Sequence, residues 1–266
     1  MKKARLDKLV VRKGLAENLR QAQSLIMAGQ VLVDGHVMDK AGNRIPVGAQ
    51  VTVREKLRYV SRGGIKLEHA LDRFAVDVSE KTAVDIGAST GGFTDCLLQR
   101  GARTVYAIDV GYGQLAWQIR QDARVVVLDR TNIRHLASLP ELVDLATVDV
   151  SFISLDLVLP QVVRLLRPEG DLLTLIKPQF EAEREQVGNG GVVRDPVVHR
   201  LVLEKVIRRA ATEKLAVVGL IPSPLTGRAG NVEFFAHLSR HQRLDNTDIE
   251  EALKQCLGEA ETICRL

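Results

Sequence analysis

The chain has 266 residues, 45% of them hydrophobic and 26% charged, which is typical of a folded, soluble protein with one large or two modest domains. It lacks a run of about 18 apolar residues, and its basic start lacks the apolar core of a secretory signal. Its three cysteines, Cys96, Cys256 and Cys264, have no zinc-like spacing and are too few for a disulfide framework. We therefore expect a cytoplasmic protein with no membrane-spanning helix and no metal site.

The net charge of +4 is unevenly distributed along the chain. Residues 1–66 contain 14 lysines and arginines and 5 aspartates and glutamates, whereas the remaining residues contain 23 and 28. This basic front predicts contact with a polyanion such as a nucleic acid. A solvated charged surface without a partner is the alternative interpretation.

The first 60 residues predict a small binding module. Apolar residues in "RLDKLVVRKG" and "ENLRQAQSLIMAG" recur at helical spacing, and Gly14 and Gly29 are plausible stops. The segments "QVLVDG" and "AQVTVRE" predict short strands on either side of a turn-rich "GNRIPVG". Two small helices and a hairpin-like sheet cannot bury a large core, so the module is better suited to binding.

From residue 80 onward, strand-like runs alternate with helical or loop segments. They are "TAVDIG", "TVYAIDV", "RVVVLD", "LATVDV", "GDLLTLIK", "LAVVGLIPS" and "NVEFFAHLS". This alternation predicts an α/β fold with a mostly parallel sheet. The loop between the last two runs is short for a helical crossover, so we expect an antiparallel pair and a seven-stranded sheet with a reversed edge. The tail has one amphipathic face and predicts a packing or oligomer helix.

The glycine-rich turn in "AVDIGASTGGFTDCLLQRGA" is the most informative segment. Asp85 ends a strand, and Gly87, Gly91 and Gly92 precede a helix, so the backbone can turn tightly and approach a ligand. Open α/β sheets bind ligands beyond the carboxyl ends of their strands. The spacing is not the G-x-G-x-x-G of a dinucleotide site, and a structural turn without a ligand is the alternative.

Two further acids follow the next two predicted strands. Asp109 lies where a carboxylate can accept hydrogen bonds from a ribose diol, and Asp129 lies where it can meet an adenine amino group. Acidic walls repel phosphate but suit a cationic sulfonium. The pattern therefore favours S-adenosylmethionine over NAD or ATP, although an aspartate at a strand end is common without any ligand.

Two lysines and two carboxylates are candidates for chemistry at the same edge of the sheet. They are Asp149 and Lys177 at the ends of the fourth and fifth predicted strands, Glu233 in or near the seventh, and Lys66 on a helix before the first. Each alone is readily explained as an ordinary surface or strand-end residue. Together they could orient or deprotonate a hydroxyl group.

Six ordered motifs resemble the TlyA/hemolysin A family over about residues 3–240: "YVSRGGIKLEHAL", "VDIGASTGGFTDCLLQRGA", "DVSFISL", "LIKPQFE", "GGVVRDP" and "GNVEFF". In that family an S4-type RNA-binding domain precedes an FtsJ-like methyltransferase domain. The resemblance implies an S-adenosylmethionine-dependent ribose 2′-O-methyltransferase that acts on cytidine in ribosomal RNA or a ribosomal subunit. It also implies a catalytic tetrad of Lys66, Asp149, Lys177 and Glu233.

The resemblance sets the expected fold class, domains and cofactor contacts. The fold class is α/β, a seven-stranded Rossmann-like class I methyltransferase sheet with a small N-terminal α+β RNA-binding domain. The expected divisions are an RNA-binding domain (1–58), a linker (59–65), a methyltransferase domain (66–240) and a helical tail (241–266). The expected S-adenosylmethionine contacts are Asp85, Gly87, Ser89, Gly91, Gly92, Phe93, Asp109 and Asp129.

Basic residues near the front are candidates for contacts with RNA phosphates, which set affinity without reading sequence. They are Arg5, Lys8, Arg12, Lys13, Arg20, Arg58 and Arg62. Tyr59 is the only aromatic residue among the first 66, so we expect recognition of RNA shape more than base stacking by this module. Two rival functions are a non-catalytic RNA-binding protein with the same fold and a hemolysin that acts on membranes.

Overall fold

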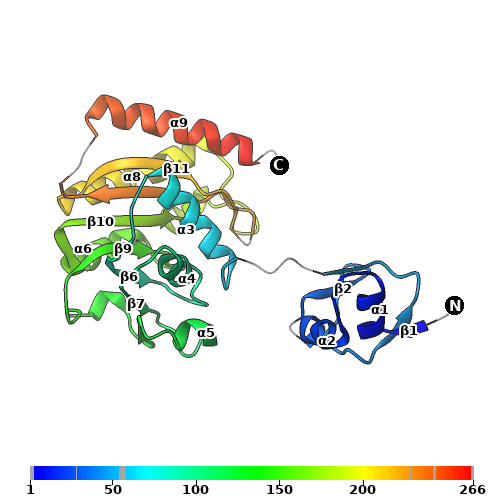
Figure 1. The fold of residues 1–266 in the computed structure, drawn as a ribbon. Coiled ribbons are helices and arrows are strands. Elements are labelled where there is room, and N and C mark those ends of the chain that lie inside the picture. Colours follow the sequence, from blue (N-terminus) through cyan, green and yellow to red (C-terminus); the bar gives the residue numbers. More distant parts are fainter. Residues whose placement is uncertain (1–2, 28, 54–57, 228, 242–243, 265–266) are drawn as a thin grey trace. The chain divides into compact units, whose positions relative to one another are not determined.

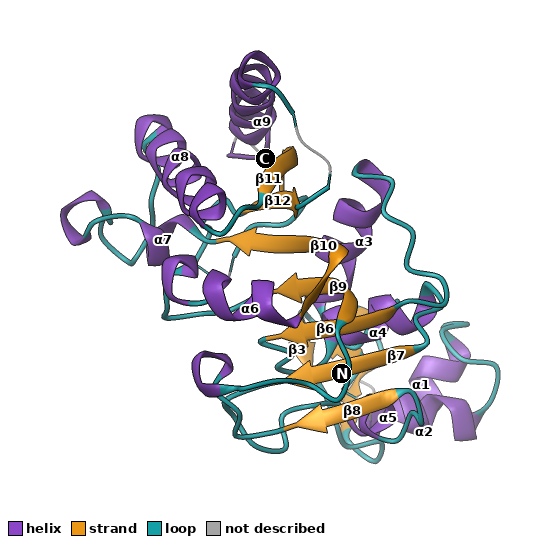
Figure 2. Cartoon of the chain, turned by 90° about the vertical axis from the view of Figure 1, so that its left-hand side faces the viewer, coloured by secondary structure: helices purple, strands orange, loops and turns teal. Residues whose placement is uncertain are grey.

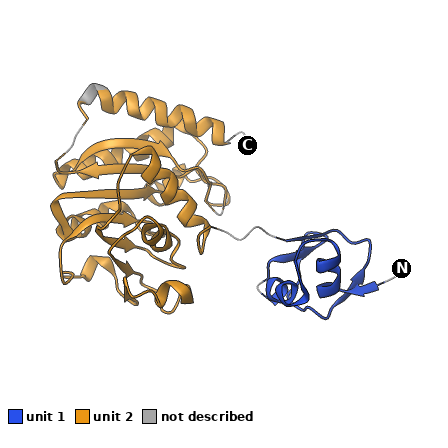
Figure 3. Ribbon diagram, in the orientation of Figure 1, with its two compact units in different colours: residues 1–57 blue, residues 58–266 orange. Residues whose placement is uncertain are grey.

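The computed structural model describes residues 3–27, 29–53, 58–227, 229–241 and 244–264. The chain divides into two compact units, residues 1–57 and 58–266, which Figure 3 colours separately. Each unit has its own hydrophobic core, and each is described by itself.

The first unit is a small α+β domain, as the sequence predicts (Figure 1). Its helices and strands are β1 (Lys3–Arg5), α1 (Leu6–Arg12), α2 (Leu19–Met27), β2 (Val31–Val33), β3 (His36–Val37), β4 (Arg44–Pro46) and β5 (Val51–Val53). The two helices and strands β2 and β5 confirm the predictions. Strand β4 lies inside the predicted turn, where it pairs with β1. The three strands that were not predicted, β1, β3 and β4, have only two or three residues each, too few for an alternating pattern to be recognised.

The second unit is built on a seven-stranded sheet with the order β11-β12-β10-β9-β6-β7-β8. Its strands are β6 (Thr82–Ile86), β7 (Thr104–Ile108), β8 (Val125–Leu128), β9 (Val143–Val148), β10 (Leu166–Ile176), β11 (Ala216–Pro222) and β12 (Phe234–Ser239). All seven predicted strands are confirmed. The reversed strand is not at the edge as predicted: β12 runs antiparallel between β10 and β11, and β11 is the outer strand.

Helices cover both faces of this sheet (Figure 2). They are α3 (Arg62–Arg73), α4 (Gly92–Gln99), α5 (Trp117–Arg120), α6 (Leu159–Leu165), α7 (Pro178–Glu181), α8 (Pro196–Thr212) and α9 (Asn246–Cys264), with short 3-10 turns η1 (Ile133–His135), η2 (Leu155–Leu157) and η3 (Arg184–Gln186). Helices α3 and α4 lie on one face, and α6 and α8 lie on the other.

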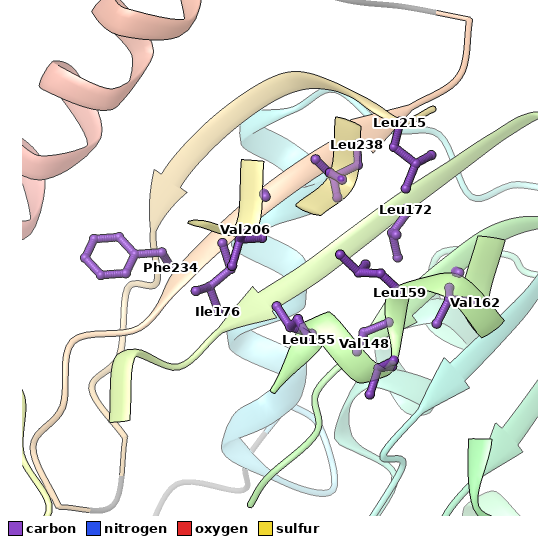
Figure 4. Packing of buried hydrophobic residues seen from close by; sticks show 14 of the residues in the cluster. Val148, Leu155, Leu159, Val162, Leu172, Ile176, Val206, Leu215, Phe234 and Leu238 are labelled. Carbon is purple, nitrogen blue, oxygen red and sulfur yellow. The ribbon is translucent and has the colours of Figure 1, made fainter. Parts of the chain in front are cut away.

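Alternate residues of the central strands enter two different cores. On β10, Leu172 and Ile176 pack with residues of α6 and α8, as Figure 4 shows, whereas Leu173 and Leu175 pack with residues of α3 and α4. Because both faces are covered, such strands are continuously hydrophobic in sequence. This explains why the central strands were recognisable as apolar runs.

The boundaries of the second unit differ from the predicted ones. Tyr59 is 2% exposed and belongs to the core beneath α3, and α3 itself starts at Arg62, so residues 59–65 are not a free linker. The predicted tail is also part of this unit. Helix α9 packs on the sheet core through Leu253, Cys256 and Ala260, which confirms the packing interpretation.

Candidate active site

The four predicted tetrad residues meet at one edge of the sheet. Asp149 directly follows β9 and Lys177 directly follows β10, which are parallel neighbours and end at the same edge. Strand β12 runs the other way, so Glu233, which directly precedes it, lies at that edge too. Lys66 comes from α3, on one face of the sheet.

Lys66 and Glu233 form one ion pair, with Lys66 Nζ hydrogen-bonded to Glu233 Oε2. The side chains are 11% and 4% exposed, so the pair is largely shielded from water. Charges that are removed from water in this way interact more strongly than surface pairs. The pair therefore ties α3 to the start of β12.

Lys177 and Asp149 form a second ion pair, with 2.6 Å between Lys177 Nζ and Asp149 Oδ1. The angle at this contact is not that of a hydrogen bond, and Nζ instead donates to Ser151 Oγ at 2.8 Å. The Lys177 and Asp149 side chains are 12% and 24% exposed. This pair is more open to solvent than the first, and a substrate can reach it more easily.

The backbone brings the two pairs together. The last rung between β10 and β12 joins Ile176 and Phe234, so Lys177 and Glu233 stand opposite each other one residue further on. Opposed residues of antiparallel strands have Cα atoms about 4.5–5.5 Å apart. Two lysines and two carboxylates therefore converge on a single stretch of the sheet edge.

The position of Lys66 depends on close packing between α3 and α4. Gly92 begins α4, and a Cβ atom at Gly92 would overlap Ser61 Oγ and lie 2.9 Å from the backbone nitrogen of Gly64. Any larger residue would therefore push the two helices apart. Gly92 thus has a packing role, whatever its backbone contributes to a ligand.

The predicted glycine loop lies beside the tetrad. Gly87 has φ +86°, and a Cβ atom there would overlap the backbone carbonyl of Asp149. Gly91 has φ +92°, a left-handed conformation that favours glycine. The loop between β6 and α4 therefore passes directly against the backbone that presents Asp149.

Asp109 organises this loop. Its Oδ2 accepts a hydrogen bond from the Ser89 backbone N–H at 2.8 Å, and its Oδ1 accepts one from Gly111 at 2.7 Å. The carboxylate is half-buried and keeps further lone pairs for a ligand. Asp109 therefore fixes the turns at Ser89 and Gly111, and its predicted contact with a ribose diol stays a prediction.

Asp129 is engaged by a neighbour that the sequence did not indicate. Its Oδ2 lies 2.7 Å from Arg120 Nη2, and the hydrogen bond from Arg120 lowers the pKa of Asp129. The Gly113 backbone N–H also donates to this carboxylate, at 3.3 Å. Contact with adenine would have to share the carboxylate with Arg120.

Asp85 and Phe93 are buried and contact other residues of the protein, and their predicted contacts with the cofactor stay predictions. Asp85 is fully buried and accepts hydrogen bonds from Thr94 Oγ1 at 2.7 Å and from Thr147 Oγ1 at 3.2 Å. Burial, with a smaller contribution from the nearby charge of Asp149, raises the pKa of Asp85 to about 7. The Phe93 ring is 3% exposed and stacks on Phe235. A side chain next to a glycine loop can contact a ligand or can be buried beneath the loop and support it. Sequence alone does not distinguish these two positions.

The predicted RNA contacts fall in both units. Lys8, Arg12, Lys13 and Arg20 are exposed on the first unit, and Arg5 there is bound to Asp7 through two hydrogen bonds. In the second unit, Arg58 forms an ion pair with Glu68, and Arg62 Nη2 donates to the Thr226 carbonyl at 2.9 Å. The exposed four are the best available for phosphates, and all seven stay predictions.

The sequence analysis missed an aromatic pair next to Lys177. Phe152 is 91% exposed with φ +62°, and its ring centroid lies 5.1 Å from that of Phe180. Lys177 Nζ lies 6.0 Å from the Phe180 ring centroid. Phe152 and Phe180 belong to the motifs "DVSFISL" and "LIKPQFE", which the sequence analysis recognised. The sequence did not show that the Phe152 ring is exposed or that it contacts Phe180.

Glu181 was also missed. This buried carboxylate accepts hydrogen bonds from Ser154 Oγ at 2.6 Å and from the Leu155 N–H at 2.7 Å, and burial raises its pKa. It therefore joins the segment after Asp149 to the turn after Lys177.

Among the described residues, no helix is long and apolar enough to cross a bilayer. Nor do the described histidine, cysteine and acidic side chains form a group of three that could hold a metal ion.

Comparison with known proteins explains this arrangement. Residues 59–240 match the FtsJ-like methyltransferase family, and residues 4–51 match the S4 domain. The chain belongs to the FtsJ-like methyltransferases. This confirms the predicted family and the predicted fold class of an FtsJ-like sheet with an N-terminal S4 domain.

Three relatives match this FtsJ-like methyltransferase over most of its length. YqxC of Bacillus subtilis, which carries the name of an rRNA methyltransferase, is 53% identical and covers 89% of this chain and 86% of its own. The 16S/23S rRNA (cytidine-2′-O)-methyltransferase TlyA of Mycobacterium tuberculosis is 45% identical and covers 97% and 98%. A solved structure from Streptococcus thermophilus that carries the hemolysin name is 45% identical, covers 98% of each chain and has a TM-score of 0.74.

An FtsJ-like methyltransferase uses S-adenosylmethionine, which confirms the predicted cofactor. The residues present fit this molecule. The loop with left-handed Gly87 and Gly91 lets the backbone approach a ligand, and the carboxylates of Asp109 and Asp129 follow the next two strands. An acidic wall suits the positive sulfonium and disfavours the phosphates of a nucleotide.

Proposed function

We propose that this protein methylates the ribose 2′-hydroxyl of a cytidine in ribosomal RNA, with S-adenosylmethionine as methyl donor, in the cytoplasm. One observation carries the proposal: the ion pairs Lys66–Glu233 and Lys177–Asp149 lie side by side at the sheet edge, against the glycine loop. The name of the Mycobacterium tuberculosis relative supports the choice of cytidine and of ribosomal RNA.

The reaction needs a positioned hydroxyl more than it needs a strong base. When bound, S-adenosylmethionine supplies an electrophilic methyl group on a positively charged sulfur. A ribose oxygen held at Lys177 would form a bond to this carbon as the carbon–sulfur bond breaks, and its proton would pass to the Lys177–Asp149 pair. Holding the two reactants in line removes much of the barrier, because the entropy of their encounter is lost in the binding step.

Lys177 is the residue that orients the hydroxyl. Asp149 and Ser151 hold Nζ from two sides, which fixes where the amine points. The hydroxyl proton passes to the Lys177–Asp149 pair and then to solvent, which reaches this pair because Asp149 is 24% exposed. The more buried Lys66–Glu233 pair holds the second amine and fixes the start of β12 beside Lys177.

The aromatic pair supports a nucleotide substrate. A ribose at Lys177 carries a base, and a base of a single-stranded RNA loop can be splayed out and stacked on an aromatic side chain. The exposed ring of Phe152, supported by Phe180, offers a surface on which that base can stack. This function for Phe152 explains why a large apolar side chain stands 91% exposed beside the site.

A methyl-transfer assay tests the proposal. The purified full-length chain is incubated with radiolabelled S-adenosylmethionine and ribosomal RNA from cells that lack this protein, or with purified ribosomal subunits. We expect label in RNA from at least one of these substrates. Matched controls without enzyme should contain no label. An RNA-binding protein without activity would retain the RNA and transfer no label, and a membrane-acting hemolysin would release dye from liposomes instead.

A further inference from the structure

Two segments beside the tetrad are joined at three successive places. The Asp149 segment (residues 149–155) follows β9, and the Lys177 segment (residues 177–181) follows β10. The contacts between them are, in chain order, Ser151 with Lys177, Phe152 with Phe180, and Ser154 and Leu155 with Glu181. The first two contacts involve side chains that act on a substrate in the proposed function, whereas the third is buried beneath them.

The Glu181 side chain is the buried end of this series. The residue is 4% exposed, and its carboxylate accepts hydrogen bonds from Ser154 Oγ at 2.6 Å and from the Leu155 N–H at 2.7 Å. Both partners are donors, which suits an ionised carboxylate. Lys205 on α8 lies 4.0 Å from this carboxylate and donates to the Glu181 carbonyl at 2.7 Å. Helix α8 therefore holds Glu181 in place.

These hydrogen bonds fix the start of η2. Ser154 Oγ also accepts a hydrogen bond from the Asp156 N–H at 3.1 Å, so the same hydroxyl caps this turn. Leu155 is 2% exposed and packs in the core near Leu159 (Figure 4). A buried N–H without a partner is costly, so the Leu155 backbone depends on the Glu181 oxygen. The chain is thus fixed two residues after Phe152.

Phe152 has a strained backbone next to this fixed point. Its φ of +62° lies in the left-handed region, which bulky residues rarely adopt. Such a conformation persists only where the surrounding structure imposes it. The Phe152 side chain is 91% exposed, so its own burial does not impose it. The constraint comes from the fixed residues on either side, Ser151 bound to Lys177 and Ser154 bound to Glu181.

We propose that Glu181 is a positioning residue for methyl transfer. By holding Ser154 and Leu155, it imposes the backbone conformation in which Phe152 presents its ring to the base of the target nucleotide. The inference rests on the proposed function, in which that ring stacks on a base. Glu181 is buried and acts only through its neighbours. Without its side chain, the Asp149 segment relaxes and the ring turns away, whereas the glycine loop and Asp109 are unaffected.

Methyl-transfer kinetics of the full-length Glu181→Ala variant test this role. We expect kcat/KM for RNA to fall by about 5- to 150-fold, the range for loss of one base–aromatic stack, with unchanged calorimetric affinity for S-adenosylmethionine. Glu181→Gln retains an oxygen for the Leu155 N–H and should recover most of this loss. The control is Asp171→Ala, which removes a partly buried carboxylate bound to His237, about 20 Å before Lys177 along the strand. It should leave the use of RNA unchanged.

A double-mutant cycle with Phe152→Ala separates positioning from general stability. If Glu181 acts through the Phe152 ring, Glu181→Ala should cause less than about a twofold further loss of kcat/KM once the ring is absent. Equal losses with and without the ring would overturn the proposal, as would a Glu181→Ala variant that uses RNA as well as the wild type does. If Glu181→Ala fails to fold, Ser154→Ala breaks the same contact from the other segment and decides in the same way.

The wild-type reaction in the same experiment separates the two levels of the account. A wild-type chain that transfers no methyl group to RNA would refute the proposed function, and the role of Glu181 with it. An active wild type with an equally active Glu181→Ala variant would refute the role of Glu181 alone.

Discussion

Lys177 stands opposite Glu233 across the β10–β12 ladder, one residue beyond the rung that joins Ile176 to Phe234. Each of the two has its ion-pair partner elsewhere: Lys177 pairs with Asp149 after β9, and Glu233 pairs with Lys66 on α3. The register of β12 thus sets the position of both pairs. A slip by one residue would turn Glu233 to the opposite face of the sheet and separate it from Lys66.

Replacing Lys177 should stop the chemistry without loss of the cofactor. We expect Lys177→Ala to lower the single-turnover rate of methyl transfer by about 10²- to 10⁴-fold, the range for a positioned proton-transfer group. Calorimetric affinity for S-adenosylmethionine should stay within about twofold of wild type, because the glycine loop and Asp109 are untouched. Lys254→Ala, at an exposed position of α9, is the control. Near-normal turnover of Lys177→Ala would refute the role of Lys177.

Replacing Phe152 should weaken the use of RNA and leave the affinity for S-adenosylmethionine unchanged. Phe152→Ala should lower kcat/KM for RNA by about 5- to 150-fold, the effect of removing one base–aromatic stack. Phe152→Trp keeps a stacking surface and should retain most activity. Thermal stability should not change, because the side chain is 91% exposed. An equal loss for both variants, or a loss of S-adenosylmethionine affinity, would argue against a stacking role.

The strands and the strand-end positions of Asp149 and Lys177 could be predicted from sequence because their signals are local, whereas the family resemblance implied the full tetrad. The strands of the second unit are apolar runs, and Asp149 and Lys177 directly follow two of them. What could not be predicted depends on side-chain direction. The sequence did not show that Asp85 faces Thr94 and Thr147 inside the protein, that Phe93 packs on Phe235, or that Arg120 reaches Asp129.

The order of the last two strands needed tertiary information. A short connection indicates that β11 and β12 are antiparallel neighbours, but it does not say which of them lies against β10. The extent of the second unit was equally hidden. Tyr59 enters the core because Gly64 on α3 leaves room for its ring. The spacing of apolar residues in the sequence does not reveal this contact between α3 and the segment before it.

The buried carboxyl of Asp85 should make stability depend on pH. Burial raises its pKa from the ordinary value of 3.8 to about 7. The stability that it contributes is fully present below about pH 4, where both folded and unfolded chains are protonated, and is lost as pH rises through about 7. The loss amounts to at most about 4 kcal/mol above pH 7.

Urea denaturation of Asp85→Asn across this window checks the sign. Relative to wild type, the variant should gain stability progressively from pH 4 to pH 8, because asparagine cannot ionise. Glu169→Gln, which removes an exposed carboxylate, should show no comparable trend. Parallel stability–pH curves for wild type and Asp85→Asn would contradict the assignment of a raised pKa to Asp85.

The S4 domain should supply salt-dependent affinity for RNA. Arg12 and Lys13 are exposed, and neither forms an ion pair with another described residue. The double replacement Arg12→Ala with Lys13→Ala should weaken binding similarly for different RNA sequences and reduce the salt slope by about 2, one per lost phosphate contact. Filter binding at several salt concentrations measures this. The charge-conserving exchange Arg12→Lys with Lys13→Arg should keep the slope, and an unchanged slope in the alanine variant would exclude these phosphate contacts.

The chemical position of the transferred methyl group tests the central claim most directly. Ribosomal RNA from cells that lack the protein is treated with the purified chain and S-adenosylmethionine, digested to nucleosides and analysed by mass spectrometry. We predict a new 2′-O-methylcytidine with the wild-type chain that is absent with Lys177→Ala. A methyl group on a base, or equal formation of 2′-O-methylcytidine by Lys177→Ala, would contradict the assignment of Lys177, Asp149, Lys66 and Glu233 to ribose methylation.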